Sequence, residues 1–166
     1  MNDFIIAESG IRQLHARFSD AVFRRDADAF VQCFAETGEW KLAAMHMRGR
    51  EEIRKTFALL LGATEKVHLI LGLPLLEVNG NTAIGRISCT EFTKMPDGSS
   101  SLALGIYYDR YVEVDGQWLF QWRHFGLQYR GPMDMSLAMV DSPDYGPFPG
   151  MPEADEPTLT RRPEAS

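Results

Sequence analysis

Residues 101–129, SLALGIYYDRYVEVDGQWLFQWRHFGLQY, are the stretch that decides the fold of this chain. Two long runs rich in β-branched and aromatic residues, 101–114 and 117–129, flank the dipeptide Asp115-Gly116. Such runs joined by Asp-Gly are typical of a β-hairpin, because both residues adopt the left-handed backbone that a tight hairpin turn needs. The stretch therefore predicts two long, antiparallel strands.

The same period-two pattern extends upstream of this hairpin. Asn79-Gly80 and Pro96-Asp97-Gly98 are further turn signals. Every connection is short, so the strands should form one antiparallel, strongly twisted sheet. The predicted strands lie near residues 67–78, 82–94, 101–114 and 117–129.

The front of the chain is helical in pattern instead. Ile11, Leu14, Phe18 and Val22 recur at the spacing of a buried helical stripe. Asp26 is a natural N-cap for a short second helix, and a third helix should begin near residue 50. Three helices followed by a β-meander predict an α+β domain.

Length and charge narrow the function classes. The chain has 166 residues, 45% of them apolar, and a formal net charge of −6. One domain is expected, and neither a nucleic-acid backbone nor an anionic membrane is an expected partner. No apolar stretch approaches 18 residues and the first residues carry no basic charge, so a cytoplasmic location is expected.

The character of the sequence changes after Gly131. Prolines, glycines and acidic residues dominate the remainder, which has no periodicity and cannot build a core of its own. Apolar residues such as Tyr145 and Phe148 should anchor it to a surface of this subunit or of a neighbour. The expected organisation is a domain of residues 1–131 and a tail of residues 132–166.

Histidines are the candidates for chemistry in this sequence. It has no glycine-rich phosphate loop, no nucleophile elbow and no paired metal-ligand spacing, so neither a cofactor nor a metal is expected. His68 precedes an apolar run, which places it at the wall of a hydrophobic interior as a candidate acid or base. A structural histidine is the alternative.

The last strand offers a second histidine. Strand alternation predicts that Trp118, Phe120, Trp122 and His124 share one face, with Arg123 turned to solvent or to a partner. An imidazole on an aromatic wall suits a small-molecule pocket. The alternative is that these aromatic side chains belong to the packed core and that His124 is a polar residue at the end of the sheet.

Several strings in this order resemble the SnoaL-like branch of the nuclear transport factor 2-like superfamily. The strings that carry the resemblance are Phe18-Ser19-Asp20-Ala21-Val22-Phe23-Arg24-Arg25-Asp26, Phe34-Ala35-Glu36-Thr37-Gly38-Glu39-Trp40, Gly49-Arg50-Glu51-Glu52-Ile53 and Tyr107-Tyr108-Asp109-Arg110-Tyr111. The resemblance implies a cone-shaped, curved antiparallel sheet (an α+β barrel) packed on three N-terminal helices. The pattern is most similar to the group of scytalone dehydratase and the lindane dehydrochlorinase.

That resemblance implies a cofactor-free elimination and a trimer. His68 falls at the position of the group's catalytic base, while Phe23 occupies the position of the aspartate that holds this base. Two functions therefore stay open: a lyase or isomerase acting on a small hydrophobic cyclic molecule, and a non-catalytic module that binds such a molecule. A structural role, such as that of an oxygenase small subunit, is a third.

One enclosed pocket is expected near the helix-one side of the sheet, lined by Phe18, Val22, Trp40, Leu61, His68, Tyr108 and Trp122. The candidate catalytic residues are His68 and His124. The candidate substrate-binding residues are Phe18, Val22, Phe23, Trp40, Leu61, Tyr108, Trp122 and Tyr129. Because the strand 101–107 carries apolar residues on both faces, the outer face of the sheet should be covered by another subunit in a dimer or trimer.

Overall fold

The computed structural model describes residues 3–158, and these form three helices and a seven-stranded sheet. The α+β prediction is confirmed, and Asp26 caps the second helix by accepting a hydrogen bond from the amide of Ala29 (2.8 Å). The helices are α1 (Asp3–Arg24), α2 (Ala27–Val31) and α3 (Gly49–Gly62). The strands are β1 (Phe34–Leu42), β2 (Met45–Arg48), β3 (Lys66–Leu71), β4 (Leu75–Asn79), β5 (Thr82–Lys94), β6 (Ser100–Val114) and β7 (Gln117–Gly131).

The sheet is mixed. Its strand order is β2-β1-β7-β6-β5-β3, with β4 also paired to β5. The meander β5–β6–β7 is antiparallel as expected, and Asp115 and Gly116 both have positive φ in its last turn. However, β1 joins β7 in parallel. That pairing links strands far apart in the sequence, so no local turn signal announced it.

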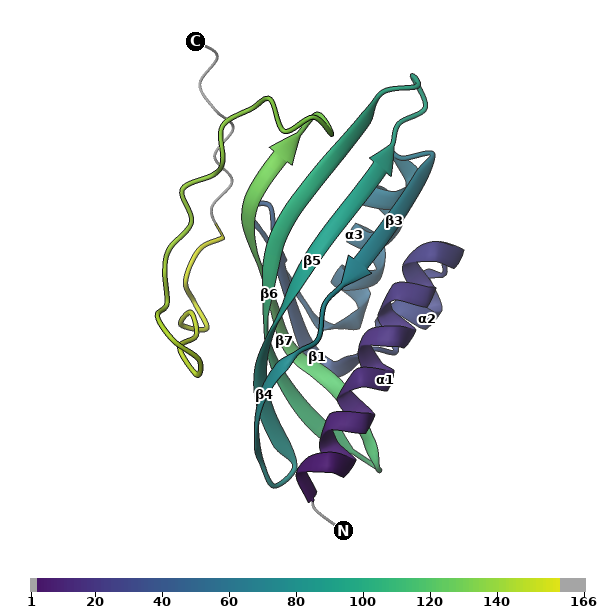
Figure 1. Cartoon of the computed structure of the whole chain (residues 1–166). Coiled ribbons are helices and arrows are strands. Elements are labelled where there is room, and N and C mark those ends of the chain that lie inside the picture. Colours follow the sequence, from purple (N-terminus) through teal and green to yellow (C-terminus); the bar gives the residue numbers. More distant parts are fainter. Residues whose placement is uncertain (1–2, 159–166) are drawn as a thin grey trace.

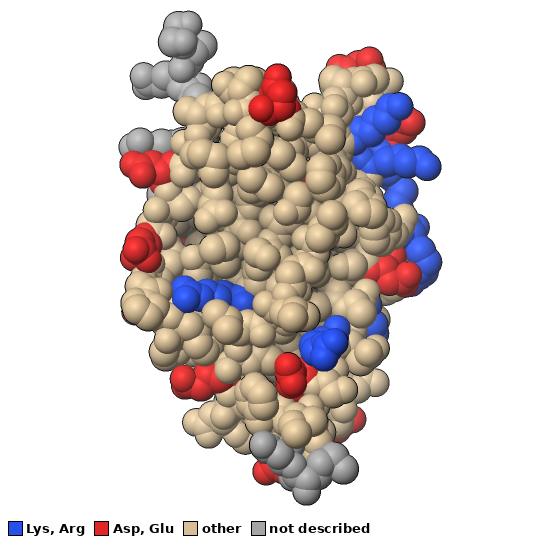
Figure 2. All heavy atoms as spheres, in the orientation of Figure 1, with Lys and Arg blue, Asp and Glu red and all other residues tan. Residues whose placement is uncertain are grey.

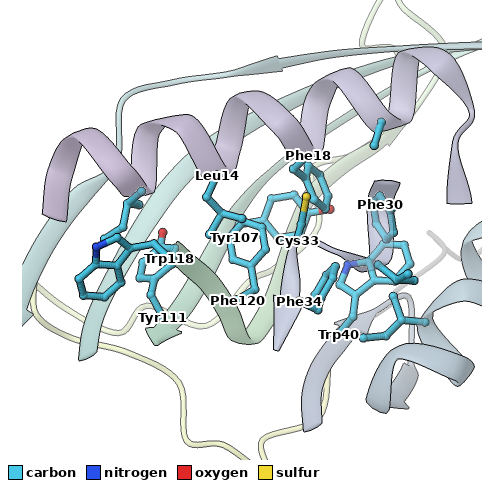
Figure 3. Packing of buried hydrophobic residues seen from close by; sticks show 14 of the residues in the cluster. Leu14, Phe18, Phe30, Cys33, Phe34, Trp40, Tyr107, Tyr111, Trp118 and Phe120 are labelled. Atoms are coloured by element: carbon cyan, nitrogen blue, oxygen red, sulfur yellow. The ribbon is translucent and has the colours of Figure 1, made fainter. Parts of the chain in front are cut away.

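The core lies between α1 and the inner face of the sheet (Figures 1 and 3). The predicted stripe of α1 is buried, and the ring of Phe18 packs against the rings of Phe30 and Phe120, with centroids 4.8 and 5.7 Å away. Phe30 also stacks on Phe57 of α3 at 3.9 Å. Aromatic side chains from helices and strands therefore fill the space in which one large enclosed pocket was expected.

A β-bulge at Gln121 overturns the predicted face of β7. Arg110 pairs with Trp122 and Tyr111 pairs with Phe120, so Gln121 is an extra residue in the strand. A bulge changes which side of the sheet the following side chains face. Phe120 thus points into the core, whereas Trp122 turns outward and Arg123 inward.

The predicted strand 67–78 is two strands, and β3 lies at an edge of the sheet. The chain leaves the sheet at residues 72–74, where Pro74 has no amide hydrogen to donate to a ladder. Leu69 is buried, but Ile70 is 52% exposed and Leu73 81% exposed. The expectation of a strand buried on both faces is therefore wrong.

The segment after β7 lies along the outer face of the sheet (Figure 1). Trp122 donates its indole N–H to the carbonyl of Ala154 (3.2 Å), and Arg110 donates to that of Pro152 (3.2 Å). This segment, residues 132–158, is called the tail below; residues 159–166 of the predicted tail lie outside the described residues. The tail covers part of the face expected to meet another subunit. Figure 2 shows mostly uncharged residues across the upper middle of one side, with Lys and Arg gathered along its right-hand edge. A dimer or trimer stays a prediction.

Within residues 3–158, no helix is long and apolar enough to cross a membrane.

Gly10→Ala is expected to destabilise the fold by about 1–2 kcal/mol, because a Cβ at this position of α1 would stand 2.5 Å from Cδ1 of Trp118. Alanine favours a helix by up to about 1 kcal/mol, which offsets part of that cost. Gly62→Ala in α3 is the matched control, since its Cβ would meet nothing within 4 Å and should be stabilising. Urea unfolding of both variants measures the difference, and equal effects would contradict the contact.

Candidate functional site

A pocket of about 570 Å³ opens between the end of α1 and strands β3 and β5. It is called the edge pocket. Val22 and Phe23 of α1, Val67 of β3 and Phe92 of β5 supply its apolar lining, and His68 supplies an imidazole. Three of the predicted site residues, Val22, Phe23 and His68, therefore lie together.

His68 is exposed in this pocket rather than buried in the interior. Strand alternation places Leu69 in the core and His68 on the other side of β3. The ring of Phe23 meets the imidazole edge-on, with centroids 4.9 Å apart, and Phe92 lies at 6.3 Å. Residue 23 thus faces His68, as the family resemblance implied, but as an aromatic ring. In the described part of the chain, His68 forms no ion pair with a carboxylate.

Cations outnumber acids around the edge pocket. Arg25, Lys66 and Lys94 line it, with Glu65 as the acidic residue. The guanidinium of Arg25 donates to the backbone carbonyls of Leu61, Thr64 and Glu65, which ties the end of α1 to the loop after α3. The resulting positive field favours a ligand or leaving group that carries negative charge.

A chain of polar side chains runs through the core beside the aromatic rings. His15 Nε2 lies 3.0 Å from the hydroxyl of Tyr111, and that hydroxyl donates to Asp109 Oδ2 at 3.0 Å. Asp109 Oδ1 lies 3.3 Å from Arg123 Nε. The Arg123 guanidinium is fully buried over the rings of Tyr107 (3.7 Å), Phe120 (4.2 Å) and Phe18 (4.3 Å).

Burial is the main cause of the pKa shifts in this row of polar side chains. It raises the pKa of Asp109 to about 6, although the charge of Arg123 and the bond from Tyr111 act in the opposite direction. Burial, and then the charge of Arg123, hold the pKa of His15 well below its usual value. Because its pKa is lowered, His15 is uncharged near neutral pH. Among the described residues, the guanidinium nitrogens of Arg123 and Nδ1 of His15 have no hydrogen-bond partner.

Sequence reasoning missed this row of polar side chains, because strand alternation predicts Arg123 on the outer face. Asp109 and Arg123 are direct cross-strand partners. Their pairing depends on the bulge at Gln121, which shifts the register of β7 against β6. By contrast, Asp20 of α1 is 62% exposed and pairs with Arg24 at the surface. His15 also lines a separate pocket, which is smaller than the edge pocket (about 230 Å³) and lies beside Gly72 and Pro74.

His124 lies under the tail, away from His68. Its ring stacks on Trp122 (5.3 Å) and meets Tyr108 edge-on (6.2 Å). Burial first, then the charges of Lys41 and His46, lower the pKa of His124 to about 4. The side chains of Tyr108 and His124 line a pocket of about 250 Å³ between the sheet and the tail, so the predicted single site is divided.

The other predicted binding residues lie elsewhere. Phe18 and Trp40 are part of the packed core, and Leu61 packs against its edge. Tyr129 is fully buried and donates to the carbonyl of Pro132 (2.8 Å). The edge pocket and the pocket under the tail each hold only part of the predicted set, because core packing and the bulge separate Phe18 and Trp40 from Tyr108 and Trp122.

Known structures share this architecture. A protein from Novosphingobium aromaticivorans provisionally named a scytalone dehydratase is 19% identical, with a TM-score of 0.74, covering 79% of this chain and 91% of that one. A hexachlorocyclohexane dehydrochlorinase, LinA type 2, is 17% identical with a TM-score of 0.73, covering 84% and 96%. A Mycobacterium tuberculosis protein of unknown function is 25% identical with a TM-score of 0.72, covering 82% and 80%.

No curated protein matches the sequence. The family model of the SnoaL-like domain matches residues 4–124, which include α2, α3, nearly all of α1, the buried polar chain and every lining residue of the edge pocket except Met133. The chain belongs to the SnoaL-like domain family.

Proposed function

We propose that this chain is a cofactor-free lyase or isomerase that acts on a small hydrophobic cyclic molecule in the edge pocket, with His68 as the acid or base. One observation carries the proposal: the imidazole of His68 stands in a pocket with apolar walls and three cationic residues. Apolar walls suit a hydrophobic ring, and a neutral imidazole can accept a proton near neutral pH.

An elimination fits these groups. His68 takes a proton from a ring carbon, the C–H electrons form the new double bond, and the group on the neighbouring carbon leaves with its bonding pair. Lys66, Lys94 and Arg25 favour the departing negative charge. The structural neighbours include proteins named for dehydration and dehydrochlorination, which supports this reaction class.

Phe23 favours a second candidate, a module that binds the same kind of molecule without converting it. The edge of this ring lies against the imidazole, where a carboxylate would hold the ring and stabilise its charged form. His124 lies in a different pocket and is therefore not proposed as the partner of His68.

His68→Ala is expected to lower kcat/KM about 10²–10⁴-fold for hydroxylated or halogenated ring compounds, the usual contribution of a positioned acid or base. Binding of the compound should remain, because the apolar walls are unchanged. His46→Ala is the matched control, since His46 pairs with Glu39 on β1 and lies outside the edge pocket. Equal turnover by His68→Ala and wild type would refute the role of His68. Tight binding without turnover by the wild-type protein would establish the binding module instead.

A further inference from the structure

The pocket between the outer face of the sheet and the tail is separate from the edge pocket. It is called the tail pocket, has a volume of about 250 Å³, and shares no lining residue with the edge pocket. Residues from β5, β6 and β7 form its floor, and Ser142, Pro143, Tyr145 and Pro157 of the tail form its cover. The site therefore exists only while the tail lies on the sheet (Figure 1).

Three polar side chains of the tail pocket have bonding capacity that the described residues leave unused. Arg86 donates to the carbonyl of Gly146 at 3.1 Å and its guanidinium lies 5.7 Å from the centre of the Phe148 ring, but it forms no ion pair with a carboxylate within residues 3–158. The hydroxyl of Tyr108 forms no hydrogen bond to the described residues. Nδ1 of His124 is buried without a partner, and this side chain is only 2% exposed. Buried or half-buried groups of this kind ordinarily find a partner.

Arg86 gives the tail pocket a cationic group that can bind an anion, although the carboxylates of Asp144 and Glu156 are also close enough to act on Tyr108. Arg86 is a half-buried cation in a chain whose acidic residues outnumber its basic ones, 23 to 17. Asp144 also lines the pocket, but it is exposed and its Oδ1 accepts the amide hydrogen of Gly146 (2.8 Å). Burial raises the pKa of Tyr108, so its hydroxyl stays protonated and can donate. Guanidinium and phenol groups together suit a carboxylate.

The remaining walls favour a flat ring. Ile106 and Leu127 are apolar, and Tyr145 meets Tyr108 edge-on with ring centroids 5.1 Å apart. Gly126 leaves its side of the pocket open, since a Cβ there would stand 3.0 Å from the ring of Tyr108. The volume lies below the usual range for drug-sized ligands, about 300–1,000 Å³, so a single ring is the size that fits.

We propose that the tail pocket is a second ligand site, which binds a small aromatic carboxylate. Its carboxylate would accept hydrogen bonds from Arg86 and Tyr108, and its ring would lie between Leu127 and Tyr145. His124 would form the inner wall. This site does not depend on the function proposed for the edge pocket, because the two pockets have no residue in common.

Titration of the full-length protein with benzoate, followed by ¹H–¹⁵N NMR, tests the proposal. Amides of Gly126, Leu127 and Ser142 should shift in a saturable way, while those around His68 should not. Arg86→Gln should weaken benzoate about 10-fold or more, the usual effect of losing a hydrogen bond to a charged group. Benzamide, which has the same ring without the charge, should bind the wild type more weakly by a similar factor.

Two variants separate ligand contacts from effects on the tail. Tyr108→Phe keeps the ring and should weaken benzoate several-fold with the tail amides unchanged. Arg130→Gln is the matched control for charge, because Arg130 is on β7 but exposed and outside the pocket, and benzoate binding should equal that of the wild type. Absence of saturable shifts, shifts centred on His68, or equal affinity in wild type, Arg86→Gln and Tyr108→Phe would each overturn the proposal.

Discussion

Asp109→Asn is expected to lower the free energy of unfolding by about 3–5 kcal/mol, the usual cost of removing one partner of a buried ion pair. The side chains of Asp109 and Arg123 are both fully buried, with 3.3 Å between the carboxylate and the guanidinium. Asparagine keeps an oxygen that can accept the bond from Tyr111 but removes the charge that compensates Arg123. Urea unfolding at about pH 7, where the carboxylate is largely ionised, measures the loss.

Two further proteins make this measurement specific. Asp20→Asn is the same chemical change at an exposed pair with Arg24, and it should cost at most about 0.5 kcal/mol. Asp109→Leu combined with Arg123→Met removes both charges, and it should be less destabilised than Asp109→Asn. A double variant that is less stable than Asp109→Asn would show that Arg123 stabilises the fold mainly through its packing on aromatic rings and not through its ion pair with Asp109.

The hairpins and helices were predictable because their signals are local. Asp115-Gly116 has the positive φ angles that the sequence implied, and the stripe from Ile11 to Val22 is buried as its spacing required. The face of β7 was not predictable. Gln121 is neither glycine nor proline, so nothing in the sequence marks it as the extra residue of a bulge. Because side chains alternate along a strand, that single residue moved Arg123 into the core and His124 out of it.

Of the candidate site, only the contact between Phe23 and His68 was predictable from the sequence. The contact between Phe23 and His68 followed from the family resemblance, and the structure places the two rings against each other. The burial of β3 did not follow, since a short apolar run does not reveal whether a strand lies at the centre or the edge of a sheet. Likewise, the covering of Trp122 by Ala154 depends on the path of a tail that has no periodic pattern.

Acidification is expected to destabilise this protein through its buried histidines before most carboxylates are protonated. The pKa of His124 is about 4 in the folded chain, against an ordinary value of 6.5. Between these two pH values the unfolded chain binds more protons than the folded chain, so the free energy of unfolding falls as the pH falls. His124 alone should contribute a loss of about 2 kcal/mol between pH 7 and pH 5.

His15 acts in the same direction, because its pKa is also held below the usual value, whereas Asp109 opposes both. With a pKa near 6 in the folded chain, Asp109 binds its proton at a pH where the unfolded carboxyl is ionised, which favours the folded state on acidification. Urea unfolding of the wild type and of a His124 variant, each at about pH 7 and pH 5, separates the contribution of His124 from those of His15 and Asp109. His124→Gln should reduce the acid-induced loss by about 2 kcal/mol. An acid-induced loss that keeps its wild-type size in His124→Gln would mean that the cover of the tail over His124 does not exclude water.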